Sequence, residues 1–219
     1  MAIIRVINPN SNDTVTRAMS EALELLRLDN GPKIDCITLS DGPFGVESDD
    51  DVRAASALVV DEVVRDKNAD AFVIACYSDP GLTIARSKTD KLVFGMAESA
   101  ILTAVTRGGD FGVISILDQS VPRHMKHLEA NGMAHFCAGD RAVNMTVAES
   151  AGSDSAYKRL VEVGTELRDK DNAKCVILGC AGMARYRSSL ETELGIPVID
   201  PVQAGTAMAL GVVCLDNKL

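Results

Sequence analysis

The chain has 219 residues, of which 47% are hydrophobic and 24% are charged, and its formal net charge is −9. This composition is typical of a soluble globular protein, and the length of the chain is enough for one large domain or two small ones. The negative charge and the lack of lysine and arginine clusters argue against nucleic-acid binding. No apolar run is long enough to cross a membrane, and residues 1–7 are too strand-like for a signal peptide, so we expect a cytoplasmic protein.

Apolar runs alternate with helical patterns along the first part of the chain. Strands are predicted at residues 3–7, 33–39 and 71–75, and helices at residues 14–27 and 52–65. A side chain among residues 11–13 is expected to cap the first helix. The acidic run at residues 47–51 is interpreted as the solvated start of the second helix, where negative charge is favourable.

The second part of the chain repeats this alternation. Helices are predicted at residues 98–107, 121–131 and 157–170, and strands at residues 111–116, 144–148, 175–178 and 197–199. Asp200 and Pro201 are typical of the start of a last helix. His124 and His127 lie one helical turn apart without a third ligand, so we expect an exposed helix face rather than a metal site.

Strands that alternate with helices indicate parallel sheets with helical crossovers. The pattern also suggests a duplication, because residues 4–10 correspond to residues 111–117 at an offset of 107 (111 − 4). Cys76 and Cys180 stand at a similar offset of 104 (180 − 76), each directly after a buried strand. We therefore expect an α/β fold of two similar halves, each contributing one cysteine loop.

Cys76 and Cys180 are the candidate catalytic residues. Ligands gather at the carboxyl ends of parallel strands, and both cysteines occupy that position. A thiol there can act as nucleophile, metal ligand or proton-transfer group, and a nucleophile would normally need a histidine, which neither loop contains. Proton transfer needs only a thiolate, which a helix N-terminus could stabilise, and a thiol on the opposite face of a carbon atom. The structural alternative is that both are buried hydrophobes.

The other four cysteines are interpreted as structural. Cys36, Cys175 and Cys214 lie inside strand or helix patterns and are expected to pack in the core, whereas Cys137 lies in a stretch predicted to be irregular. The wide spacing of all six, without a secretory signal, predicts free thiols.

Several residues around the cysteines are candidates for substrate binding. Negative charge on a carbonyl oxygen next to the reacting carbon needs hydrogen-bond donors, which the backbone of both cysteine loops can supply. Asparagine and serine side chains can orient polar groups, although the asparagines can also be turn residues. The candidates are Asn8, Asn10, Tyr77, Ser78, Ile116, Ala181 and Gly182.

These loops resemble the hydantoin racemase branch of the aspartate/glutamate racemase superfamily. The matching motifs occur in the family's order along the whole chain, at residues 7–12, 75–81, 94–99, 178–183 and 201–205. The resemblance implies two flavodoxin-like or Rossmann-like open parallel-sheet domains related by a pseudo-twofold axis, formed by residues 1–95 plus 202–219 and by residues 96–201. It further implies an active site between them, Cys76 and Cys180 as the acid–base pair, no cofactor or metal, and a homo-oligomer that acts on 5-substituted hydantoins or allantoin.

Departures from related branches limit the alternatives. The glutamate racemase branch has Cys-Asn-Thr and Cys-Thr-His where this chain has residues 76–78 and 180–182, so aspartate or glutamate is a less favoured substrate. A decarboxylase branch lacks the cysteine at position 76. A maleate-type cis–trans isomerase and a non-catalytic small-molecule-binding protein remain alternatives. Ser78 stands where the hydantoin branch often has a smaller residue.

Overall fold

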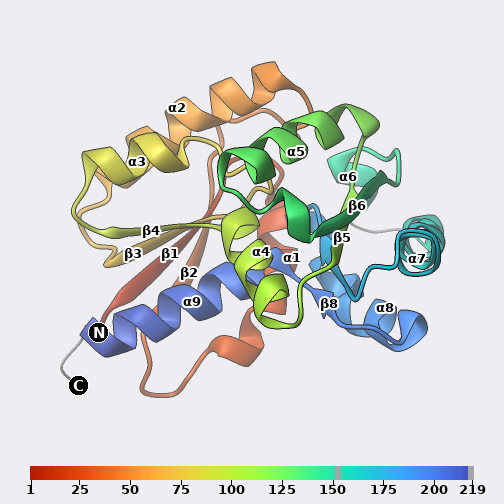
Figure 1. Cartoon of the computed structure of the whole chain (residues 1–219). Helices are drawn as coiled ribbons and strands as arrows, with labels where there is room; N and C mark the ends of the chain where they lie inside the picture. The colour runs from red at the N-terminus through yellow and green to blue at the C-terminus, as the bar shows by residue number, and fades with distance from the viewer. Residues whose placement is uncertain (151–153, 217–219) are drawn as a thin grey trace.

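The computed structural model describes residues 1–150 and 154–216, which form two four-stranded parallel sheets flanked by helices (Figure 1). The first sheet has the strand order β2-β1-β3-β4. Its strands are β1 (Ile3–Asn8), β2 (Lys33–Thr38), β3 (Ala71–Ile74) and β4 (Leu92–Gly95). The helices up to the second sheet are α1 (Asp13–Ala22), α2 (Asp49–Arg65), α3 (Leu82–Lys88) and α4 (Met96–Thr106).

The second sheet has the equivalent order, β6-β5-β7-β8. Its strands are β5 (Phe111–Ser115), β6 (Cys137–Ala142), β7 (Cys175–Leu178) and β8 (Val198–Ile199). Its helices are α5 (Val121–Ala130), α6 (Val147–Ser150), α7 (Asp154–Asp169) and α8 (Arg187–Leu194). The last helix, α9 (Pro201–Asp216), returns to lie against β1, β3 and β4 of the first sheet. Residues 217–219, which the sequence assigned to the first domain, lie outside the described residues.

The duplication predicted from the sequence is confirmed by the strand register. Ile7 of β1 pairs with Ile74 of β3, and Ile114 of β5 pairs with Leu178 of β7. The two central pairs are therefore related by the same offsets, 107 (114 − 7) and 104 (178 − 74), that relate the sequence motifs. The α/β fold of two similar open parallel sheets is confirmed, and each cysteine follows the third strand of its own half.

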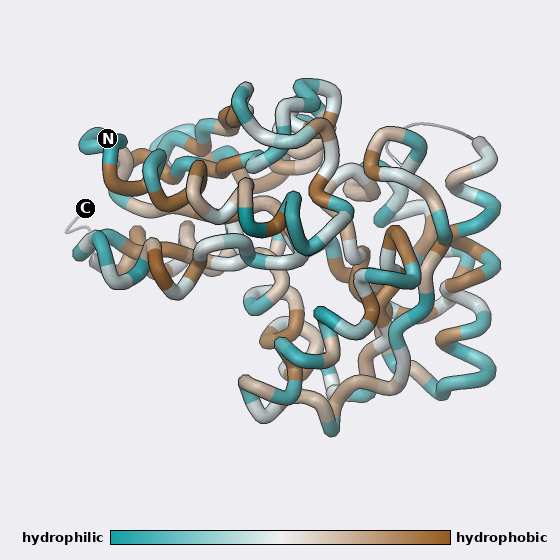
Figure 2. Tube along the Cα trace, turned by 90° about the horizontal axis from the view of Figure 1, so that it is seen from above, coloured by the Kyte–Doolittle hydropathy of each residue, from teal (hydrophilic) through white to brown (hydrophobic). Residues whose placement is uncertain are grey.

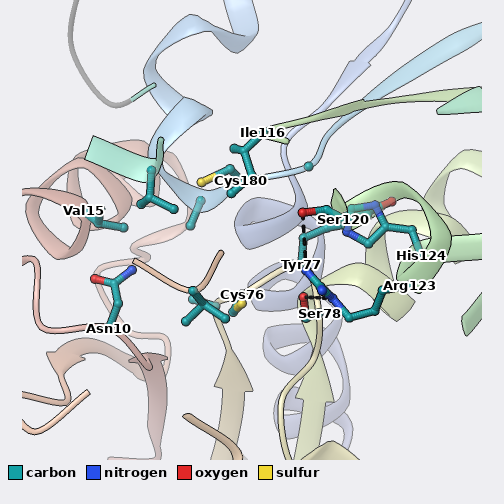
Figure 3. A pocket seen from close by; sticks show the side chains of 15 residues that line it. Asn10, Val15, Cys76, Tyr77, Ser78, Ile116, Ser120, Arg123, His124 and Cys180 are labelled. Atoms are coloured by element: carbon teal, nitrogen blue, oxygen red, sulfur yellow. Dashed lines mark hydrogen bonds between the residues drawn. The ribbon is translucent and has the colours of Figure 1, made fainter. Parts of the chain in front are cut away.

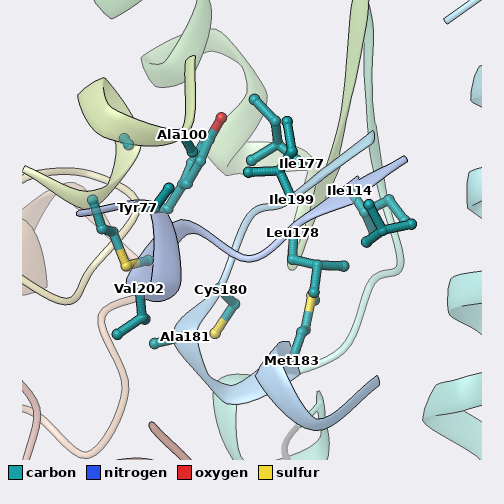
Figure 4. Packing of buried hydrophobic residues seen from close by; sticks show 14 of the residues in the cluster. Tyr77, Ala100, Ile114, Ile177, Leu178, Cys180, Ala181, Met183, Ile199 and Val202 are labelled. Atoms are coloured by element: carbon teal, nitrogen blue, oxygen red, sulfur yellow. The ribbon is translucent and has the colours of Figure 1, made fainter. Parts of the chain in front are cut away.

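One hydrophobic core runs through both halves. Figure 2 shows the hydrophobic residues concentrated in the interior and the hydrophilic ones on the outer helices. Figure 4 shows part of this core, where Tyr77 of the Cys76 loop and Ala100 of α4 lie with residues that follow β7 and β8. A second, smaller cluster around Phe72 fills the space between the first sheet and helices α2 and α3. Buried hydrophobic side chains from both halves therefore fill the base of the region between the two sheets.

Helices α4 and α9 pack closely against each other and against both halves. Gly205 of α9 lies at this contact, because a Cβ atom there would be 3.0 Å from Cγ1 of Val73 and 3.6 Å from the Cα of Met96. The glycine of the motif at residues 201–205 therefore allows α9 to lie close to β3 and α4.

The predicted starts of α1, α2 and α9 are confirmed. Asn12 caps α1 by accepting the Thr14 N–H, and Ser48 forms a capping box with Asp51 at the start of α2. Asp200 caps α9 by accepting a 2.7 Å hydrogen bond from the Gln203 N–H. The acidic first turn of α2 adds carboxylates at the positive end of the helix dipole.

Some predicted elements were wrong. No strand forms at residues 144–148 in the described structure: Asn144 has a left-handed backbone (φ 56°), and residues 147–150 are helical. The strand lies earlier, as β6, which begins at Cys137, so that stretch is not irregular. Most of β6 is only half-buried, which explains its weak hydrophobic signal. Helix α1 ends at Ala22 and a 3₁₀ turn follows, and α3, α8 and β4 were not predicted.

In the described residues, no helix is long and apolar enough to cross a membrane.

The loop after β3 is held against α4 by Asp79, a buried residue with a left-handed backbone (φ 42°). Its carboxylate accepts the N–H groups of Ala97 (3.0 Å) and Glu98 (2.9 Å) at the start of α4. A Cβ atom on Gly95 would lie 2.2 Å from this carboxylate, so glycine is required there.

Gly95→Ala is therefore expected to destabilise the fold by about 1–3 kcal/mol, because the added methyl group displaces the Asp79 carboxylate. Gly211→Ala is the matched control, since a Cβ atom there meets nothing within 4 Å. It should be neutral or stabilising by up to about 1 kcal/mol through helix propensity. Urea unfolding of both variants checks this, and equal stabilities would contradict the role given to Gly95.

Candidate active site

Cys76 and Cys180 face one cleft between the two sheets (Figure 3). Each stands two residues beyond the last residue of its strand, β3 or β7. The cleft encloses about 420 Å³, part of it open to solvent. Its lining comes from both halves, and includes Asn10, Val15, Val46, Cys76, Tyr77, Ser78, Ile116, Ser120, Arg123, His124, Val147, Cys180 and Ala181.

Both thiols lie in a poorly solvated environment. Cys180 is buried, and Cys76 is half-buried with its open part toward the cleft. Burial raises the pKa of Cys76 to about 12 and also raises the pKa of Cys180. The thiolate expected from the helix N-terminus is therefore not the resting state, because burial outweighs the favourable contacts. Cys76 in fact lies in a turn, and α3 begins only at Leu82.

The favourable contacts of the two sulfurs are equivalent in the two halves. Cys76 receives a hydrogen bond from the backbone N–H of Ser78, and Cys180 receives one from the backbone N–H of Gly182. Each donor belongs to the residue two positions after the cysteine, and each lowers the pKa of its thiol. The Ser150 hydroxyl, which donates to the Val147 carbonyl oxygen (2.9 Å), also lowers the pKa of Cys180. These N–H groups were predicted as donors to a substrate oxygen, but in this structure they are directed at the sulfurs.

The electrostatic surroundings of the two thiols differ. Arg123 lowers the pKa of Cys76, whereas Asp79 and the other thiol, Cys180, raise it. The pKa of Cys180 is raised by the charges of Glu47 and Asp200. The positive charge near Cys76 and the negative charges near Cys180 make the two sites chemically unequal.

The loop after β1 is held by its own asparagines. Asn8 is fully buried, and its Nδ2 donates to Oδ1 of Asn10 (3.0 Å) and to Oγ1 of Thr16 (3.0 Å). Oδ1 of Asn10 also accepts the N–H of Asn12 (3.0 Å). Asn10 lines the cleft, whereas Asn8 lies behind Asn10 and supports the Asn10 side chain.

The other predicted binding residues also lie at the cleft. Tyr77, Ser78, Ile116 and Ala181 line it, and Gly182 contributes through its N–H.

Helix α5 supplies lining residues that the sequence did not point to. Arg123 donates from Nε to Oγ of Ser78 (3.2 Å), and His124 is buried against the Tyr77 ring. The interpretation of His124 as part of an exposed helix face is therefore wrong. Because α5 follows β5, its first turn lies at the carboxyl end of the second sheet, and that placement could have identified these residues.

The acidic segment before α2 binds to the second half across the cleft. Oε1 of Glu47 accepts the N–H of Val147 (2.9 Å), and its backbone oxygen accepts a hydrogen bond from Nε2 of Gln119 (3.0 Å). Asp49 forms an ion pair with Arg123 (2.6 Å). The run interpreted as a solvated helix start thus also joins the two halves.

The remaining cysteines stand apart from this cleft. Cys175 is fully buried, as predicted, whereas Cys36 and Cys214, which were also expected in the core, are half-buried; Cys137 is half-buried as well. All six cysteines are free. Within residues 1–150 and 154–216, no group of three or more His, Cys, Asp or Glu side chains is arranged to hold a metal ion.

Known proteins share this fold and sequence. The family model described as Asp/Glu/Hydantoin racemase matches residues 4–209. Hydantoin racemases of Pseudomonas sp. (strain NS671) and Paenarthrobacter aurescens are 35% and 36% identical, covering 98% and 97% of this chain and 87% and 91% of those proteins. The structure of allantoin racemase from Klebsiella pneumoniae is similar with a TM-score of 0.92 and 28% identity, over 98% of this chain and 89% of that one.

The fold and the sequence similarity place the chain in the class of racemases, which are isomerases. More specifically, the chain belongs to the Asp/Glu/hydantoin racemase family. The resemblance inferred from the loop motifs is therefore confirmed.

A buried carboxylate near Cys180 has a pH-dependent effect on stability. Asp200 is 2% exposed, and its Oδ2 has no hydrogen-bond partner among the described residues. Burial raises its pKa from 3.8 to about 6. The folded protein therefore holds this proton more tightly than the unfolded chain, so the contribution of Asp200 to stability is greatest below pH 3.8 and is lost as the pH rises through about 6.

Asp200→Asn should remove this dependence, because the amide keeps an oxygen to cap α9 and carries no charge. Relative to the wild type, the variant should gain about 2 kcal/mol as the pH rises from 4 to 7. Urea unfolding of both proteins at several pH values measures the difference. A difference that does not change with pH would contradict the raised pKa of Asp200.

Proposed function

We propose that this protein inverts C5 of a 5-substituted hydantoin or of allantoin, without a cofactor, using two cysteines. The observation that carries the proposal is that Cys76 and Cys180, from equivalent positions of two similar sheets, line one cleft. The relatives named hydantoin racemase and the structural neighbour named allantoin racemase support the substrate class.

The reaction requires one base and one acid on opposite faces of C5. The thiolate of one cysteine removes the C5 proton, so the C5–H bond breaks and an S–H bond forms. The electron pair left on C5 delocalises onto the adjacent carbonyl oxygen. The other thiol then gives its proton to the opposite face, which leaves that sulfur as thiolate and the carbon inverted. In the reverse direction the two residues exchange roles.

The electrostatics of the cleft suit a pair in which only one thiol is ionised at a time. Each thiol opposes ionisation of the other, as the effect of Cys180 on the pKa of Cys76 indicates. The N–H groups of Ser78 and Gly182 are placed to stabilise whichever sulfur becomes ionised. Arg123 lowers the pKa of Cys76 and so offsets part of the effect of burial there.

Substrate binding is assigned to the polar groups around the cysteines. Oδ1 of Asn10 is occupied by the N–H groups of its own loop, which leaves its Nδ2 to donate to a ring carbonyl. Asn8 acts through Asn10, whose side chain it positions. The side chains of Tyr77 and Ile116, with Ala181, form the apolar part of the wall.

Cys76→Ser and Cys180→Ser should each reduce racemisation by about 10²–10⁴-fold, because a hydroxyl group is a far weaker acid than a thiol and almost none of it ionises to act as a base. Each variant should still exchange the C5 proton of one enantiomer with deuterated solvent, and the two variants should act on opposite enantiomers. Circular dichroism follows racemisation and proton NMR follows exchange. Cys214→Ser is the matched control, since this half-buried residue of α9 lies outside the cleft. Full racemisation by either active-site variant would end the two-cysteine mechanism.

The substrate class is tested separately on single enantiomers of substituted hydantoins, allantoin, aspartate and glutamate, with maleate followed by absorbance. Loss of optical rotation without a change of mass on hydantoins or allantoin supports the proposal. Turnover of maleate or an amino acid alone would replace it with another reaction of the family. Binding without turnover of any compound would indicate a non-catalytic protein.

We also propose a cytoplasmic, homo-oligomeric protein that binds neither nucleic acid nor membrane. The cysteine pattern supports the location and the acidic charge argues against nucleic-acid binding, whereas the homo-oligomer is what the family resemblance implies. Fractionation of cells and light scattering of the purified protein would test location and assembly.

A further inference from the structure

A buried polar cluster lies beside the cysteine cleft in the second half. Ser115 ends β5, Asp140 belongs to β6 and His124 lies on α5. Nδ1 of His124 is 2.9 Å from Oδ2 of Asp140 and 3.1 Å from Oγ of Ser115. The Ser115 hydroxyl donates to Oδ1 of Asp140 in a short hydrogen bond. The cluster thus joins two strands of the sheet to the helix that borders the cleft.

This geometry determines which nitrogen of His124 carries the proton. The Asp140 side chain is only 2% exposed, and the His124 side chain 6%. A buried carboxylate requires hydrogen-bond donors, so the proton belongs on Nδ1, where it is donated to Asp140. A carboxylate on one ring nitrogen fixes both the tautomer and the orientation of the ring, and makes the other nitrogen a stronger acceptor. Nε2 therefore presents a lone pair.

Nε2 is also the nitrogen that remains available. In the described part of the chain it has no hydrogen-bond partner, whereas Nδ1 has two. His124 lines the cleft that contains both cysteines, and Tyr77 packs edge-on against its ring with centroids 4.9 Å apart. In Figure 3, His124 and Arg123 lie on one side of the two sulfurs and Asn10 lies on the other. An oriented acceptor therefore borders the space that a substrate would occupy.

We propose that Nε2 of His124 accepts a hydrogen bond from a ring N–H of the substrate. This inference rests on the proposed function and deepens it, since a hydantoin ring carries two N–H donors and two carbonyl acceptors. Asn10 donates to a carbonyl from one side of the cleft and His124 accepts an N–H from the other. Together they place C5 between Cys76 and Cys180. The recognised class is a cyclic ureide with a free N–H group, and Asp140 acts as a positioning residue through His124.

The test compares an N–H substrate with derivatives in which that donor is removed. The probes are one enantiomer of 5-benzylhydantoin and its 1-methyl and 3-methyl derivatives, each assayed for racemisation by circular dichroism. The wild type should prefer the parent over one of the two derivatives by about 10- to 100-fold in kcat/KM, because methylation leaves the acceptor unpaired. His124→Leu should lower kcat/KM for the parent by about the same factor and reduce that preference to near one.

Three further variants separate recognition from folding. His124→Gln keeps an acceptor oxygen near the position of Nε2 and should restore much of the preference. Asp140→Asn leaves the cleft wall in place, but its amide can donate to Nδ1 and move the ring proton to Nε2. That variant should lose the preference without losing its fold. His127→Leu, one turn along α5, is the control and should behave as the wild type.

The outcomes are distinguishable. A His124→Leu variant that keeps the wild-type preference overturns the inference, and so does a His124→Gln variant that loses it as completely as His124→Leu. If His124→Leu fails to fold, as judged by its thermal unfolding, the inference is tested by whether His124→Gln keeps the preference for the parent compound and Asp140→Asn loses it. A wild type that racemises neither the parent nor the derivatives overturns the proposed hydantoin substrate itself, and this inference with it. Racemisation of the parent with equal kcat/KM for all three compounds overturns only the inference.

Discussion

The burial of two thiols in one cleft is the constraint on which the site depends. Removal of water raises the pKa of both Cys76 and Cys180, and the ionisation of one opposes that of the other. Such a pair needs a rigid setting, because a small displacement of either sulfur would change its solvation. The common core of the two halves, with α4 and α9 packed across it, supplies that setting. In the proposed reaction the same burial makes each thiol a poor acid in the resting enzyme and, once ionised, a strong base.

Buried polar residues near the cysteines hold backbone in place. Asn8 orders the loop after β1, Asp79 ties the Cys76 loop to α4, and Asp200 starts α9 beside the Cys180 loop. Each lies at the carboxyl end of a sheet or just beyond it, where connecting chain leaves the regular hydrogen-bond ladder. An unpaired N–H group there would cost free energy, so these side chains replace the missing partners. The side chains that face the cleft are then positioned by residues behind them.

Much of the fold and the cysteine pair could be predicted, because buried parallel strands such as β3 and β7 are continuous apolar runs. The edge strand β6 could not, since its residues are half-buried and include Gly139 and Asp140. The two cysteine loops are local motifs, whereas the setting of His124 arises from β5 and β6 meeting α5 in space. Its spacing from His127 is equally compatible with an exposed helix. The protonated resting state of the thiols depends on burial, which no local motif reports.

The hydrogen bonds that Glu47 and Asp49 make to the second half bear on how a small molecule reaches the cysteines. Any hinge motion that separates the two sheets must break the contacts of Glu47 with Val147 and Gln119, and the ion pair of Asp49 with Arg123. The Asp49 side chain is 76% exposed, so dissolved salt screens that pair directly. Dissolved salt would therefore weaken one of the contacts that such an opening motion has to break, which concerns access to the cleft rather than the chemistry between the sulfurs.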